Sequence, residues 1–193
     1  LTLSTLINRA GSMVLPFLVL YLTRSLALSA QQAASVLVVY GLISLLVAPV
    51  SGSLCDRHGP VKIMLSSLFL SGGSLLLYPH VQSYGGIVLI TAIFALFSEA
   101  FRPASMTFIS ESVPPGLQKQ AFALVRLAIN LGMSVGPVIG GFLAEKNFHL
   151  IFYVDGLTTL ASALIFLIAG AMWLCGVASL TSASRMVYAF ARD

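Results

Sequence analysis

The ionisable side chains inside apolar stretches are the residues of this sequence that could do chemistry. Glu99 and Arg102 stand three residues apart, so on a helix they share one face and can pair. Arg9 and Arg126 lie in two other apolar stretches. A charge in an apolar environment usually faces a cavity or a partner. We therefore expect Glu99, with the three arginines, to carry proton or charge coupling; a structural salt bridge is the alternative.

The composition indicates that these charges are surrounded by lipid. Of the 193 residues, 58% are apolar and 8% are charged, whereas soluble domains are about 45–50% apolar and about 25% charged. A soluble enzyme of this size would need far more polar surface. The ten Lys and Arg residues are scattered singly, without the basic stripe of a nucleic-acid-binding protein. We expect no nucleic-acid partner.

Six apolar stretches have the length of a membrane span, which takes about 20 residues. They cover residues 3–22, 33–50, 61–78, 85–108, 121–143 and 151–170. Short segments rich in turn residues separate them. The sequence predicts an all-α integral membrane bundle of six helices. A signal peptide is a weaker interpretation of the first stretch, because Arg24 interrupts the pattern.

Basic residues predict the orientation of this bundle, because Lys and Arg favour the cytoplasmic side. One side of the bundle holds four of them and the other side two; the two sets are Arg57, Lys62, Lys119 and Arg126, against Arg24 and Lys146. We expect the amino terminus to lie in the cytoplasm and the membrane to be a bacterial-type inner (plasma) membrane.

A short pattern recurs after the second and fifth stretches. Residues 52–57 and 141–146 both read Gly-x-Leu-x-acid-base, at an offset of 89. Three spans separate the copies, so they lie on opposite membrane faces, as in the inverted three-plus-three repeats of secondary transporters. Helix-end chemistry that arose independently in the two places is the alternative.

The segment between the second and third stretches carries the most specific motif. Gly52 and Gly59 permit unusual backbone angles, and Asp56 can accept from the amino end of a neighbouring helix. Arg57 and Lys62 can bind acidic groups or lipid phosphates. A solvated turn with cytoplasmic charges is the alternative interpretation.

These residues resemble the signature loop of the major facilitator superfamily, although Cys55 replaces the usual small residue and the basic run is thinner. The resemblance implies a gating loop in which Asp56 docks against a helix of a second six-helix half.

A second motif lies in the fifth stretch. Gly132, Gly136 and Gly140 stand four residues apart and form a smooth face for tight helix contact, and Pro137 permits a bend. Together with Gly141, they resemble the antiporter motif of drug and metabolite exporters in the same superfamily. The resemblance implies the amino-terminal six-helix half of an exporter that exchanges substrate for protons.

Polar side chains within the stretches predict the lining of a central path. We expect this lining to include Asn8, Tyr21, Tyr40 and Asn130, which suits amphipathic or apolar substrates; ordinary packing is the alternative. Asp155 lies near the outer start of the sixth helix, where we expect a hydrated carboxylate or a helix cap rather than a proton carrier.

The sequence lacks the residue patterns of metal sites, nucleotide-binding loops and hydrolases. His58, His80 and His149 have no second ligand at metal spacing, and Cys55 and Cys175 are expected to be free thiols. The sequence contains neither a phosphate-binding Gly-Lys-Ser/Thr loop nor a hydrolase motif. We therefore expect no enzyme activity, metal or cofactor, and energy from an ion gradient.

The end of the chain does not fit the six-helix plan. Residues 150–190 contain no convincing turn, which predicts one helix of roughly 60 Å, twice the hydrocarbon thickness. From about residue 171 the sequence is similar to a helix of amino-acid/polyamine/organocation permeases. We expect a six-helix half over residues 1–170 and an apolar tail over residues 171–193, from fusion or truncation.

The prediction is therefore half of a secondary active transporter that exports drugs or small amphipathic metabolites by alternating access. Its expected partners are a small-molecule substrate, protons, the lipid bilayer, and either a missing carboxy-terminal half or a second copy. Two alternatives stay open: a non-transporting fragment or scaffold, and part of an amino-acid permease.

Overall fold

The part of the chain that the structure describes is built from six membrane-length segments. The computed structural model describes the backbone of residues 1–192, and the side chains of residues 1–172, 175, 176, 179 and 181. The helices are α1 (Thr2–Gly11), α2 (Val14–Leu20), the π-helix η1 (Tyr21–Ser25), α3 (Ala30–His58), α4 (Pro60–Leu77), the 3-10 turn η2 (Tyr78–His80), α5 (Tyr84–Ser112), α6 (Gln118–Lys146) and α7 (Phe148–Arg192). Among the described residues, six segments are long and apolar enough to cross a membrane, which confirms the predicted all-α bundle.

The first span is interrupted, unlike the unbroken helix predicted over residues 3–22. α1 ends at Gly11 and α2 begins at Val14, so Ser12 and Met13 lie outside regular helix. Pro16 explains the position of the break, because proline lacks an N–H and its ring crowds the carbonyl four residues earlier, here that of Ser12.

The six spans pack with the symmetry of the predicted repeat. The first span packs against α6 and α7, and correspondingly α5 packs against α3 and α4. α4 and α7, the third span of each set, pack against each other. If the first three spans are exchanged with the last three, each packed pair takes the place of another packed pair. This is the pattern expected for an inverted repeat.

Polar contacts join the first span to α7 along its length. Ser4 and Ser162 each donate a hydroxyl hydrogen bond to the other's carbonyl oxygen, both at 2.9 Å. One turn further along α1, Asn8 Nδ2 donates to Thr159 Oγ1 at 3.1 Å. Residue numbers rise on α1 as they fall on α7, so the two helices are antiparallel. These contacts fix the position of α1 along the axis of α7.

The glycines of α6 pack against the other side of the first span. A Cβ placed on Gly132 would lie 2.6 Å from the Arg9 Cβ and 2.7 Å from the Ala10 nitrogen. On Gly140 it would lie 2.7 Å from the Phe17 ring. The predicted smooth face is therefore a tight helix contact, in which side chains are excluded so that two backbones can approach.

The turn between the second and third spans is shorter than predicted. α3 continues to His58, and α4 starts at Pro60, so Gly59 alone lies between them. The expected loop is thus mostly helix: Asp56 and Arg57 lie in the last turn of α3, and Lys62 in the first turn of α4. Proline at the first position of α4 suits this arrangement, because its missing N–H has no helical acceptor there.

Gly59 should not tolerate a side chain. Its φ of 82° and ψ of 146° lie in a region that is essentially restricted to glycine. We expect Gly59→Ala to lower the free energy of unfolding by about 1–3 kcal/mol. Gly52→Ala is the matched control, because no atom lies within 4 Å of its added Cβ, and we expect a gain of up to about 1 kcal/mol. Thermal unfolding in detergent, followed by circular dichroism, measures both; equal effects would contradict the assignment.

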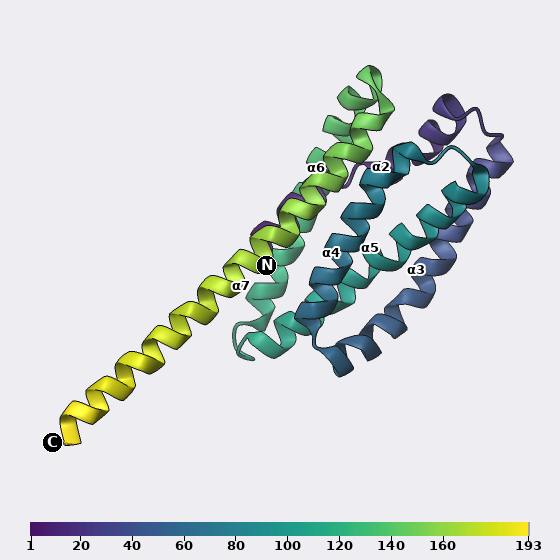
Figure 1. Cartoon of the computed structure of the whole chain (residues 1–193). Coiled ribbons are helices and arrows are strands. Elements are labelled where there is room, and N and C mark those ends of the chain that lie inside the picture. Colours follow the sequence, from purple (N-terminus) through teal and green to yellow (C-terminus); the bar gives the residue numbers. More distant parts are fainter. Residues whose placement is uncertain (193) are drawn as a thin grey trace.

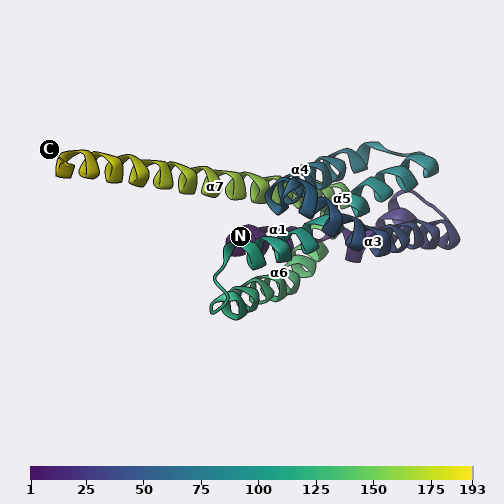
Figure 2. The same ribbon diagram turned by 90° about the horizontal axis from the view of Figure 1, so that it is seen from below.

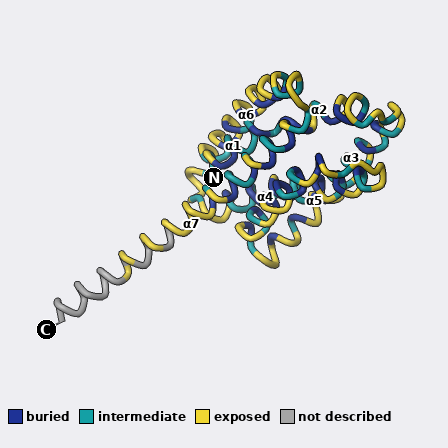
Figure 3. Tube along the Cα trace, turned by 45° about the horizontal axis from the view of Figure 1, so that its top comes forward, coloured by how far each residue is buried: buried dark blue, intermediate teal, exposed yellow. Residues whose placement is uncertain are grey.

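α7 runs beyond the bundle. It is one continuous helix of 45 residues, about 68 Å long at 1.5 Å per residue, which confirms the absence of a turn after residue 150. Its carboxy-terminal part projects away from the other helices (Figures 1 and 2). Most of its described side chains from residue 167 onward are exposed (Figure 3). The resemblance of residues 171–193 to a permease helix falls mostly on side chains outside the described residues and stays a prediction.

Candidate functional site

A cavity of about 190 Å³ lies inside the bundle, and all six spans contribute to its lining. Its ionisable residues come from four different spans: Arg9, Tyr40, Glu99 and Asp155. The other lining residues are polar or apolar: Asn8, Ser12, Leu15, Pro16, Leu68, Ser71, Phe94, Ser98, Phe101, Met133, Pro137 and Thr159. This mixture is typical of a binding site, in which apolar walls surround a few polar groups.

Glu99 lies in this cavity on α5, but its partner differs from the one that sequence spacing predicts. The Tyr40 hydroxyl, from α3, donates a hydrogen bond of 2.6 Å to Glu99 Oε1. Arg102, the expected partner, is exposed. A short bond from a neighbouring helix therefore holds the carboxyl group, and hydrogen bonds to charged acceptors are stronger than neutral ones.

Asp155 differs from the expected solvent-exposed carboxylate, because it is buried: it is 4% exposed. Its Oδ2 accepts hydrogen bonds from the backbone N–H of Met13 at 3.0 Å and of Val14 at 3.1 Å. It therefore caps a helix, but the helix is α2, 141 residues away in sequence. A signal for this role exists: Asp155, Thr159 and Ser162 follow one helical face of α7.

Arg9 lines the same cavity from α1. Its position is set from two sides, by Gly132 of α6 against its Cβ and by the contact between Asn8 and Thr159 of α7. Its Nε is buried without a hydrogen-bond partner. The cavity thus holds one guanidinium group with an unused donor among two carboxyl groups.

Tyr21, predicted to line the path, lies elsewhere. It is 1% exposed and packs edge-on against Phe152, with ring centroids 4.6 Å apart. Tyr78 and Phe148 complete this aromatic cluster. The reason is its place in the π-helix η1 at the end of the first span, where its ring packs in the core with rings from η2 and α7.

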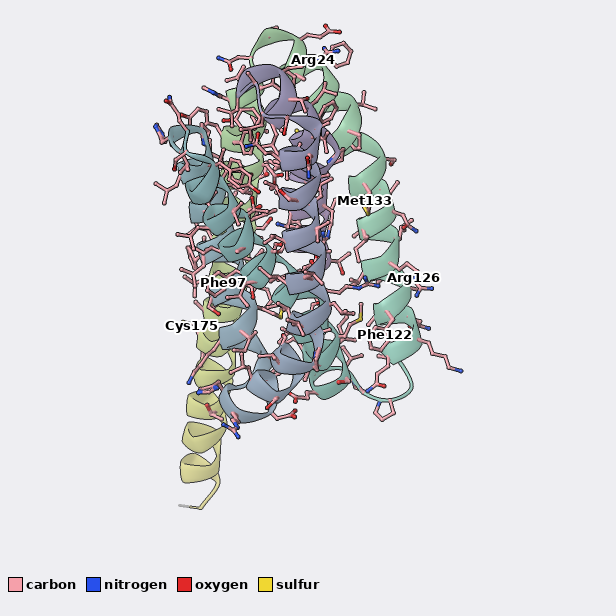
Figure 4. The ribbon with its side chains drawn as sticks, turned by 90° about the vertical axis from the view of Figure 1, so that its right-hand side faces the viewer. Arg24, Phe97, Phe122, Arg126, Met133 and Cys175 are labelled. Carbon is pink, nitrogen blue, oxygen red and sulfur yellow. The ribbon has the colours of Figure 1, made fainter. Side chains whose placement is uncertain are left out.

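Of the other predicted residues, Asn8 and Tyr40 line the cavity. Asn130 and Arg126 are exposed on α6. Figure 4 shows Arg126 on α6, with Arg24 at one end of the bundle and Met133 between the two. The structure therefore brings together Arg9, Glu99 and Tyr40, and leaves Arg102 and Arg126 outside the lining of the cavity.

The remaining predicted positions lie around the Gly59 turn and in α6. Asp56, Arg57 and Lys62 are exposed around Gly59. In the described part of the chain, no group of three or more His, Cys, Asp or Glu side chains could hold a metal ion. Cys55 and Cys175 are free thiols, the first buried and the second exposed.

Comparison with known families decides the class of the bundle. The sequence model of the Major Facilitator Superfamily matches residues 1–186. The chain belongs to this superfamily. Its members are transporters and not enzymes, so the family supports the predicted class, a transporter rather than an enzyme.

Two relatives show how much of a transporter the chain covers. The quinolone resistance protein NorA of Staphylococcus aureus is 26% identical over 144 residues, which are 75% of this chain and 37% of NorA. The MFS-type transporter YqjV of Bacillus subtilis is 28% identical over 141 residues, 72% of this chain and 34% of YqjV. The facilitator chain thus spans just over a third of the length of these relatives.

Proposed function

We propose that the chain is the amino-terminal half of a proton-coupled exporter of drugs or small amphipathic molecules. The observation that carries this proposal is the cavity, where Glu99 and Asp155 lie among polar and apolar residues contributed by all six spans. Buried carboxyl groups in membrane proteins mark ion and substrate pathways. The similarity to NorA, which is named for quinolone resistance, supports the substrate class.

The exposed arginines support the need for a second half. Arg102 lies within α5 and Arg126 within α6, and both are exposed in this six-span unit. Exposed charges inside a spanning helix are costly against lipid and favour a protein or water contact. A carboxy-terminal half, or a second copy, would cover this face and close the cavity into a path that opens alternately to either side.

The expected orientation places the Gly59 turn in the cytoplasm. Arg57, Lys62 and Lys119 lie at the end of the bundle with this turn, whereas Arg24 and Lys146 lie at the other end. The excess of cations favours the first end as the inner one, in a bacterial-type inner membrane. Asp56 would then meet the second half at the cytoplasmic face.

Export by the completed transporter should depend on Glu99. With the chain joined to the carboxy-terminal half of a related exporter, we expect Glu99→Gln to slow proton-driven dye efflux from energised cells by about tenfold or more, which corresponds to about 1.4 kcal/mol. Asp56→Asn should also reduce efflux. Glu145→Gln is the matched control, because Glu145 is exposed at the end of α6.

The same assay separates the alternatives. Unchanged efflux in the Glu99→Gln protein would contradict the coupling role. If the joined protein exports no substrate at all, a non-transporting fragment or scaffold would be favoured. Amino-acid flux in place of dye efflux would favour the permease alternative.

A further inference from the structure

The interruption of the first span depends on a side chain from the sixth. Between Gly11 and Val14 the helical hydrogen bonds are lost, and the N–H groups of Met13 and Val14 point to Asp155 Oδ2 instead. Met13, Val14 and Asp155 are 2%, 1% and 4% exposed. Buried N–H groups need an acceptor, so this one carboxylate oxygen satisfies both donors at the break.

The surroundings of Asp155 have opposing effects on the stability of its ionised form. Arg9 of α1, Tyr40 of α3 and Glu99 of α5 line the same cavity as Asp155. The cavity residues of α4 and α6 carry no ionisable group: Leu68, Ser71, Met133 and Pro137. Burial opposes the charge, whereas the two N–H donors and Arg9 favour it. A proton that enters through the cavity can change this balance.

We propose that Asp155 is a proton-operated latch on the first span. The ionised carboxylate holds the N–H groups of Met13 and Val14 and keeps the break at Ser12 in its present geometry. When a proton from the cavity binds the carboxyl group, these hydrogen bonds weaken, because a neutral acceptor is weaker than a charged one. The first span can then bend at Ser12, which moves Arg9 and Asn8 within the cavity. Only the use of this motion in transport rests on the proposed function.

The amide of Met13 reports directly on the latch. The chain has six methionines, so labelling with ¹⁵N-methionine in lipid nanodiscs gives few signals, and Met13→Leu identifies the relevant one. We expect the Met13 amide proton to shift in a single titration step between about pH 4 and about pH 9, as Asp155 gains or loses its proton. A Met13 signal that stays constant over this range would overturn the proposal.

Two variants assign the titration to Asp155. Asp155→Asn keeps an oxygen acceptor of nearly the same shape but carries no charge, so its Met13 signal should not titrate. Glu99→Gln removes the other cavity carboxyl group and should leave the titration in place. The proposal fails if Asp155→Asn still titrates, or if Glu99→Gln abolishes the step, because Glu99 would then be the responding group.

Hydrogen exchange tests the bending itself. Relative to the intrinsic exchange rate, we expect residues 9–18 to exchange several-fold faster at low pH in the native chain and not in Asp155→Asn. Equal protection at both pH values would overturn the latch. Neither measurement requires transport activity, so the two proposals can fail separately. If the Met13 signal titrates but the completed transporter exports no dye, only the proposed function is refuted. If the completed transporter exports dye but the Met13 signal stays constant, only the latch is refuted.

Discussion

Asp155→Ala should lower the free energy of unfolding by about 2–5 kcal/mol, the largest stability effect that we expect in this chain. The substitution leaves the N–H groups of Met13 and Val14 without their acceptor at buried positions. Each unsatisfied buried donor costs about 1–3 kcal/mol. The chain supplies a reporter, because Cys55 is 2% exposed and its thiol reacts only when the bundle opens.

The measurement is a thermal scan with a dye that fluoresces on reaction with thiols, in a Cys175→Ser background that removes the exposed thiol. Asp155→Asn is the control. It retains an oxygen acceptor and should lose less than half as much stability as the alanine variant. If the alanine and asparagine proteins melt together, the hydrogen bonds to Met13 and Val14 do not stabilise the bundle.

Gly132→Ala should lower the free energy of unfolding by about 1–3 kcal/mol, the range for overpacking a tight contact. The new methyl group would lie 2.6 Å from the Arg9 Cβ and 2.8 Å from the Arg9 carbonyl carbon. Backbone atoms cannot rotate away as a side chain end can, so α1 and α6 must separate. This movement would displace Arg9 from its place in the cavity.

Gly141→Ala is the matched control on the same helix. Its added Cβ would meet one atom, the Phe17 Cζ, at an ordinary distance of 4.0 Å. We expect this protein to melt within a few tenths of a kcal/mol of the native chain or above it, since alanine favours helix over glycine. The same thiol assay compares the two. A Gly132→Ala protein as stable as Gly141→Ala would mean that the two helices can separate without loss.

Both predictions concern the placement of α1. α7 holds α1 through Ser162 and Thr159 and the start of α2 through Asp155, and α6 holds α1 through the glycine face. Arg9 lies between these two contacts. The functional consequence is that the charge in the cavity follows any movement of α1 against either neighbour. Rearrangement of these helices would therefore change the position of the Arg9 charge within the cavity.

The surroundings and number of the spans follow from local sequence. Composition and the length of each apolar stretch already require a lipid environment and six helices, because every backbone polar group must be satisfied within a helix when water is absent. The packing face of α6 was also predictable, since glycines four residues apart necessarily share one helix face. Gly59 lay within a predicted turn, because turn residues separate the second and third apolar stretches. α3 nevertheless extends further than expected.

The partners of the charged side chains required the tertiary structure. Spacing on one helix paired Glu99 with Arg102, but the hydrogen bond comes from Tyr40, 59 residues away. Tyr21 has the polar atom of a lining residue, yet its ring lies in an aromatic cluster. Helical periodicity defines which residues share a face, and it does not define which helix that face will meet.

Asp155 shows most clearly where this boundary lies. The sequence alone determined that the protein is a bundle of six membrane helices with charges inside and a small-residue packing face. Only the tertiary structure decided that the carboxyl group of the sixth span closes the break in the first, 142 residues earlier. The physical reason is that a buried hydrogen bond depends on which backbone donors another helix leaves open, and that depends on how the helices pack.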